Sequence, residues 1–172
     1  MNELLNRRTL LGGAAGGLSL ALGGMAPEAM AATAMPWIRR VVHFYTGPDG
    51  QSRGEEIPFA APKPGDTDRL LRRKAERVTL SNMAPNFRYP FHNANYPTLL
   101  IPIFGTIVVI LADGKEFSVG HGEMIYAEDC TGKGHISGAG PEGCFSVQVQ
   151  LVKSRCPDQG STDFKTFWID PD

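Results

Sequence analysis

The sequence predicts an all-β protein built as a small closed barrel or sandwich. Short apolar runs alternate with glycine-rich turns through residues 92–137. Asp113 and Gly114 stand between two such runs and predict a hairpin, because glycine accepts the positive φ that tight turns need. Residues 144–152 alternate strictly between apolar and polar side chains, as a half-buried strand does. Such short strands, separated by turns, indicate a closed or sandwiched sheet.

The composition indicates one domain with a real core. The chain has 172 residues, of which 20 are glycine and 13 are proline, as a turn-rich β protein requires. The formal net charge is −1, and acidic and basic residues are interspersed, so no basic face stands out. Nucleic acid is therefore not expected as a partner.

The N-terminal residues have the features of an export signal. Arg7 and Arg8 precede an apolar run rich in glycine and alanine, residues 10–25. Small side chains then offer cleavage after Ala31 or Ala34. An arginine pair before such a weakly hydrophobic run resembles a twin-arginine signal, which exports folded proteins. An ordinary secretory signal and an uncleaved anchor are the alternatives.

We therefore expect residues 1–34 to be a cleavable signal and residues 35–172 to form a single domain. The mature protein is expected in the periplasm or secreted. No stable membrane span is expected after cleavage, because the apolar run is short and interrupted by glycines.

The three cysteines, Cys130, Cys144 and Cys156, are an odd number. An oxidising destination permits one disulfide, and the remaining thiol would be free. Their spacing matches no zinc-binding pattern.

The first half of the mature chain predicts one clear strand. Residues 38–45 are rich in β-branched and aromatic side chains, and His43 within them has no nearby partner in the sequence, so we expect a structural role for it. Residues 54–66 are rich in proline and predict a loop or arm, which wraps the barrel or reaches a second subunit. Residues 68–77 predict either one or two helical turns or a polar lead into the next strand.

The second half predicts several strands. The aromatic residues of segment 82–96 are expected to line one mouth of a barrel or to join the core. Two apolar runs meet at Gly105, and Pro102 within the first predicts an edge or a bulge. Residues 138–143 are glycine-rich and predict a turn, and the aromatic tail, residues 163–169, is expected to cover the core.

The central stretch resembles the cupin superfamily, small β-barrels of the double-stranded β-helix or jelly-roll type. In the spacing of the first cupin motif, His92 and Gly105 match the family, whereas Ala94 and Thr98 stand where it carries a second histidine and a glutamate.

In the spacing of the second motif the glycines match, and Ile125 replaces the metal-binding histidine. The positions on this spacing are Gly114, Gly120, Gly122, Ile125 and Asp129. The loop from Asp129 to His135 is also similar to a D-x-T-G-K-G-H segment in some single-domain cupins. The resemblance covers about residues 77–152. It implies the fold, and a small β-barrel with a degenerate metal motif, without implying an activity.

Within this frame we expect His92, His135 and Asp129, or Glu128 in place of Asp129, to converge as the catalytic residues. Two imidazoles and a carboxylate can hold one divalent transition metal, Fe, Mn, Zn or Ni, with His92 and His135 as ligands. The same groups can act without metal as an acid–base pair. The flexible Gly-Lys-Gly turn would fold His135 back, although it can also be a purely structural turn, and His121 is expected to be exposed.

Four residues are candidates for binding the substrate, and they are Arg88, Tyr96, Tyr126 and Gln148. The leading hypothesis is an exported cupin that binds a small organic molecule beside His92 and His135. It would transform that molecule as a lyase, isomerase, cyclase or dioxygenase-like enzyme. The alternatives are a non-catalytic periplasmic binding module, since barrels of this size can enclose a ligand, and a structural protein that forms a homodimer through residues 54–66.

Overall fold

The structure is a computed structural model that describes residues 37–66 and 72–152, all of which belong to one unit of the chain, Ala34–Asp172. The regular secondary structure of these residues is entirely β, and no helix among them is long and apolar enough to cross a membrane. The strands are β1 (Arg40–Thr46), β2 (Ser52–Pro58), β3 (Ala75–Met83), β4 (Arg88–His92), β5 (Thr98–Ile110), β6 (Glu116–Val119), β7 (Glu123–Ala127) and β8 (His135–Leu151).

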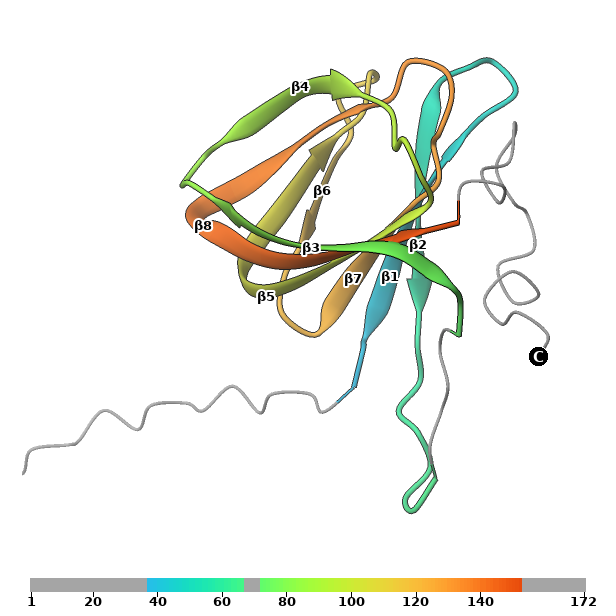
Figure 1. The fold of residues 1–172 in the computed structure, drawn as a ribbon, viewed down its shortest axis with the longest axis vertical. Helices are drawn as coiled ribbons and strands as arrows, with labels where there is room; N and C mark the ends of the chain where they lie inside the picture. Colours follow the sequence, from blue (N-terminus) through green and yellow to red (C-terminus); the bar gives the residue numbers. More distant parts are fainter. Residues whose placement is uncertain (1–36, 67–71, 153–172) are drawn as a thin grey trace, which may run out of the picture. The chain divides into compact units, whose positions relative to one another are not determined.

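The described strands form one mixed sheet of eight strands (Figure 1). Its order is β2-β1-β7-β5-β8-β3, with β4 added on β8 and β6 on β5. β1 and β7 run parallel, and the other pairs are antiparallel. The all-β prediction is confirmed, and the arrangement is consistent with a β-barrel or jelly roll.

β5 is one long bent strand rather than the two predicted strands that meet at Gly105. Its register against β8 shifts once after Pro102 and again after Gly105, so the predicted bulge is present. Gly105 has a φ of 70°, and a Cβ there would overlap the carbonyl oxygen of Gly143. Only glycine therefore allows the two strands to approach at this bend. The hairpin at Asp113 and Gly114 also forms, between β5 and β6.

β8 is also continuous, and the predicted turn at residues 138–143 is wrong. Its first half pairs with β4 and the end of β5, and its second half pairs with β3 and the start of β5. In Figure 1 the strand curves round between β4 and β3. Its glycines allow the chain to bend without leaving the sheet, and Gly143 has a φ of 80°.

The predicted arm at residues 54–66 is wrong in its first half, because β2 pairs along β1 as far as Pro58. Pro58 is tolerated there since it is the last residue of an edge strand. Residues 75–77 belong to β3 and are not helical. Residues 1–36, 67–71 and 153–172 lie outside the described residues, and so do the signal segment, the aromatic tail and Cys156.

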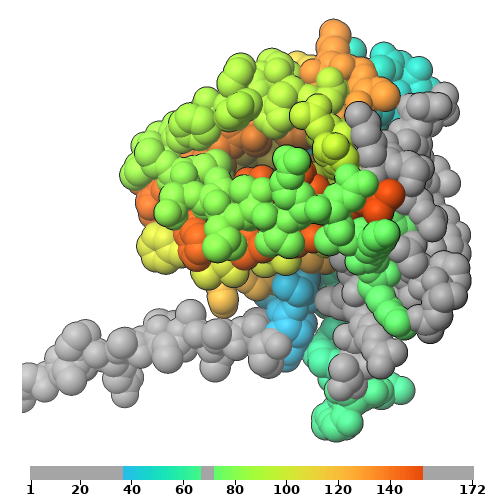
Figure 2. All heavy atoms as spheres, viewed as in Figure 1, coloured from blue at the N-terminus to red at the C-terminus, as the bar shows by residue number. Residues whose placement is uncertain are grey.

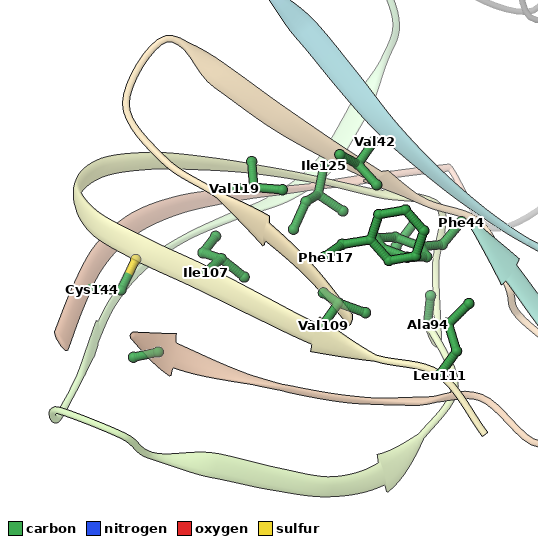
Figure 3. Packing of buried hydrophobic residues seen from close by; sticks show 12 residues of the cluster. Val42, Phe44, Ala94, Ile107, Val109, Leu111, Phe117, Val119, Ile125 and Cys144 are labelled. Atoms are coloured by element: carbon green, nitrogen blue, oxygen red, sulfur yellow. The ribbon is translucent and has the colours of Figure 1, made fainter. Parts of the chain in front are cut away.

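Both faces of β1 are buried, because its side chains alternate between two apolar clusters. Val42 and Phe44 join the larger cluster, shown in Figure 3 with Ile107, Val109 and Phe117 among its members. The second cluster lies on the opposite face and contains Val41, Leu99, Met124, Tyr126 and Leu151.

The cysteines give a direct chemical test of the fold. Cys130 is disulfide-bonded, and Cys144 is a free thiol that is only 4% exposed. Burial, aided by the charge of Glu142, raises the pKa of the Cys144 thiol, so it resists alkylation in the folded protein. We expect iodoacetamide to leave Cys130 and Cys144 unlabelled in the native protein, and to label Cys144 but not Cys130 in denaturant without reductant. Labelling of Cys130 under those conditions, read by peptide mass spectrometry, would contradict the assignment.

Candidate functional site

A cavity of about 500 Å³ lies among strands β3, β4, β5, β7 and β8. Figure 2 shows the hollow between the green strands β3 and β4, with β8 in orange behind it. Side chains from separate parts of the chain line it, and they are Ser81, Asn82, Met83, Ala84, Phe87, Tyr89, His92, Asn93, Ala94, Asn95, Thr98, Leu100, Ala127, His135, Ser137, Gln148 and Gln150.

His135 begins β8 and lies opposite His92 of β4, so sheet pairing brings the two imidazoles together. Their ring centroids are 4.7 Å apart. Nδ1 of His135 donates to Oδ2 of Asp129 at 2.7 Å, because an ionised carboxylate can only accept. This bond fixes the tautomer and leaves the lone pair of Nε2 as the basic atom of the ring. The expected proximity of His92, His135 and Asp129 is thus observed, while their chemical roles stay a prediction.

The carboxylate of Asp129 accepts hydrogen bonds from two side chains, those of His135 and Ser52. Its Oδ2 also accepts a hydrogen bond of 2.6 Å from Oγ of Ser52, the first residue of β2. The carboxylate is 0% exposed, and it lies behind His135 and not among the residues that line the cavity. Asp129 therefore fixes the orientation of the His135 ring from behind, outside the cavity lining.

His92 has the same tautomer as His135. Its Nδ1 donates to the carbonyl oxygen of Pro90 at 2.8 Å, which makes Nε2 the acceptor of the neutral ring. Oγ of Ser137 lies 3.4 Å from this Nε2, and the ring of Tyr89 packs against the imidazole at 5.2 Å between centroids. Each of the two rings thus offers Nε2 as its basic atom.

The glycines that precede His135 are packed, in contrast to the flexible turn that the sequence suggested. Gly132 and Gly134 have φ values of 76° and 72°. A Cβ on Gly134 would overlap the carbonyl group of His92, and one on Gly132 would overlap that of Gly50. The loop therefore holds His135 against the β4 end, and glycine is required by the close approach of two backbones.

The alternation in the second half of β8 places two glutamines in the cavity. Gln148 lies opposite Leu100 and Gln150 opposite Thr98, and all four side chains line the wall. Gln148 was a candidate from the sequence. Gln150 was not among the candidates, although the period-two alternation of a strand puts it on the same face as Gln148.

The other three candidates for substrate binding, Arg88, Tyr96 and Tyr126, do not line the cavity. Arg88 donates to the backbone carbonyls of Phe87 and Ala139. Tyr126 is buried on the opposite face of β7, because alternation along the strand turns Ala127 into the cavity. Phe87 and Tyr89 instead form the aromatic wall of the cavity. Of the two predictions for segment 82–96, lining one mouth of a barrel describes these residues better than joining the core.

A second polar cluster surrounds His43, which has no nearby partner in the sequence but contacts two carboxylates in the fold. Nδ1 lies 2.8 Å from Oε1 of Glu55, and Nε2 lies 2.7 Å from Oε1 of Glu128. Tyr126 stacks on the ring at 5.5 Å between centroids. Glu128, the sequence alternative to Asp129, therefore binds His43, and the partners come from residues 12 and 85 positions away.

This cluster predicts a pH dependence of stability. Burial of the ring lowers the pKa of His43, but the hydrogen bonds and charges of Glu128 and Glu55 outweigh burial, so the pKa is raised. The stabilisation is therefore complete below the unfolded pKa of about 6.5 and is lost as pH rises through the higher folded value. We expect the unfolding free energy of wild type, minus that of His43→Gln, to fall over this range in urea titrations. A difference that is flat or grows with pH would contradict the cluster.

The residues present only partly fit a transition metal. Both imidazoles meet one requirement, because each donates its Nδ1 proton to a carboxylate or carbonyl and leaves Nε2 available. Among residues 37–66 and 72–152, however, no group of three or more His, Cys, Asp or Glu side chains is arranged to hold a metal ion. Catalytic zinc sites use about three protein ligands. The donor set of the described residues is therefore incomplete for such a site.

Comparisons with known proteins do not assign the chain to a family. No family model and no curated protein matches it. Among solved structures it is similar to protein NMB1881 from Neisseria meningitidis, with 24% identity, a TM-score of 0.36, and coverage of 48% of this chain and 80% of that one.

Proposed function

We propose that the chain is an exported, cupin-like β-barrel protein that binds a small organic molecule beside His92 and His135 and acts on it by acid–base chemistry. One observation carries the proposal. Two imidazoles, each with its tautomer fixed by a bond at Nδ1, line the same cavity of about 500 Å³, and Asp129 supports one of them. This volume is in the usual range for ligand pockets, about 300–1,000 Å³.

In this proposal His135 is the general base. Nε2 takes a proton from the ligand, and the buried carboxylate of Asp129 stabilises the imidazolium that forms. The same proton then passes from Nε2 of His135 to a second atom of the ligand, with Nε2 of the neutral His92 ring, which lies beside that of His135, placed to relay it. Moving a proton between two atoms of one molecule is what an isomerase, a cyclase or a lyase requires.

A ligand screen followed by an activity assay tests the proposal. Compounds that bind should raise the melting temperature of the protein. For those that are turned over, His135→Gln should lower the rate by about 10²–10⁴-fold, the usual contribution of a general base. His121→Gln is the matched control, because His121 is an exposed turn residue. Equal loss in both variants, or no binder that depends on the cavity, would refute the proposal.

A non-catalytic binding protein is the second candidate. Asparagine, glutamine, serine and threonine side chains make up much of the lining, and such groups bind without reacting. This function predicts stabilisation by a ligand that the protein leaves unchanged after prolonged incubation.

Export is supported by chemistry within the described residues. Cys130 is disulfide-bonded, and disulfides are typical of oxidising compartments. Fusing residues 1–34 to a reporter that needs the twin-arginine route would test the signal. Export that survives Arg7→Lys with Arg8→Lys would exclude that route.

A further inference from the structure

We propose that the ligand is uncharged, carries hydroxyl or carbonyl oxygens, and presents a flat ring to the cavity. This rests on the function proposed above and specifies the class of molecule. It follows from the kinds of side chain that line the cavity and from where each kind lies.

The first argument is charge. None of the described residues that line the cavity is Lys, Arg, Asp or Glu. A carboxylate or phosphate entering it would lose hydration without meeting a fixed cation, which is costly. A ligand cation would also find no carboxylate among the described residues of the wall, because Asp129 is 0% exposed behind His135.

The imidazole of His135 does not change this balance. Protonation of His135 gives an imidazolium paired with the carboxylate of Asp129 at 2.7 Å, so the two groups together then carry no net charge. A ligand anion would then meet a cation that is already paired. The neutral form of His135 instead offers Nε2 as an acceptor for a hydroxyl or other acidic proton of the ligand.

The second argument is hydrogen bonding. Gln148 and Gln150 come from one end of β8, and His135 and Ser137 come from the other end, so the bend of the strand places two polar groups around one space. Each amide donates two hydrogen bonds and accepts others, which suits carbonyl and hydroxyl oxygens. A ligand with oxygen atoms on two sides can satisfy both groups at once.

The third argument is the aromatic wall. Phe87 and Tyr89 line the cavity yet are 41% and 55% exposed, and their rings meet at 6.1 Å between centroids. Large exposed rings at a cavity are typical of surfaces that bind. Met83 and Leu100 add further apolar surface to the lining. A flat ring in the ligand would be covered by these side chains.

Probes that differ only in charge test the proposal. Benzene, naphthalene and chromone rings, each with one hydroxyl, would carry an amide, a carboxylate or an aminomethyl group. Dissociation constants would be measured by NMR titration at neutral pH, following the imidazole signals of His92 and His135. We expect the amide form of a scaffold to bind at least about tenfold more tightly than either charged form, because only the charged forms lose uncompensated hydration.

A charge-introducing variant sharpens the test. Gln148→Lys places a cation on the wall and should shift the carboxylate-to-amide affinity ratio by at least about tenfold toward the carboxylate. Gln51→Lys, outside the cavity, is the control and should leave the ratio unchanged.

The outcomes separate the two proposals. Tighter binding of a charged form by wild type, with shifts at His92 and His135, would overturn the neutral-ligand inference while cavity binding stands. If no probe of any scaffold or charge moves those two signals, the proposed function is overturned as well.

Discussion

Replacing Glu128 with alanine is expected to lower the unfolding free energy by about 3–5 kcal/mol, the cost of removing one partner from a buried ion pair. Glu128 is 0% exposed, and it binds Nε2 of His43, which is also fully buried. The variant removes the buried carboxylate beside His43 and leaves the half-exposed Glu55 in place on the other side of the ring. The pKa of Tyr126, raised by burial and then by the charge of Glu128, should fall toward its ordinary value.

Urea denaturation at pH 6 measures the first effect, with Glu116→Ala as the control. Glu116 lies on the exposed face of β6, and its loss should cost less than about 0.5 kcal/mol. A similarly small loss for Glu128→Ala would show that the Glu55–His43–Glu128 cluster does not stabilise the fold.

Replacing Gly134 with alanine is expected to cost about 2–5 kcal/mol and to weaken ligand binding. Two effects add. The φ of 72° is unfavourable for alanine by about 1–2 kcal/mol, and the overlap of its Cβ with the His92 carbonyl group adds about 1–3 kcal/mol as overpacking. Because the new Cβ would overlap backbone atoms of His92, the overlap can be removed only if β4 and the start of β8 move apart. His135 would then move away from His92.

Gly114→Ala is a matched control for the first effect alone. Gly114 has a φ of 84°, but no atom lies within 4 Å of the position a Cβ would take. Its loss of stability should therefore be the smaller of the two, and ligand binding should not change. Equal losses of stability in Gly134→Ala and Gly114→Ala would mean that the close contact between the loop and β4 adds nothing to the cost at Gly134.

Local signals in the sequence predicted the local features of the fold. The Asp-Gly pair gave the β5–β6 hairpin, Pro102 gave the bulge, and alternation in residues 144–152 gave the second half of β8. Each depends on backbone geometry within a few residues, so no tertiary information is needed.

Features that depend on distant contacts were missed. The glycine-rich residues 138–143 predicted a turn, but pairing of β8 with β4 and β5 keeps the strand continuous. The sequence showed no nearby partner for His43, because the two carboxylates that contact it come from β2 and from the residue after β7. The proximity of His92 and His135 was expected only from the spacing of the cupin motifs. Tyr126 was wrongly placed at the cavity because the sequence does not show which face of β7 lines it.

The central claim is that a ligand binds beside His92 and His135, and ring-nitrogen NMR of the four histidines tests it directly. The account predicts that the uncharged naphthalene probe shifts the signals of His92 and His135. His43, which is buried against Glu128, and the exposed His121 should stay in place and serve as internal controls. Saturating shifts confined to His43 or His121, or none at any histidine, would contradict the account.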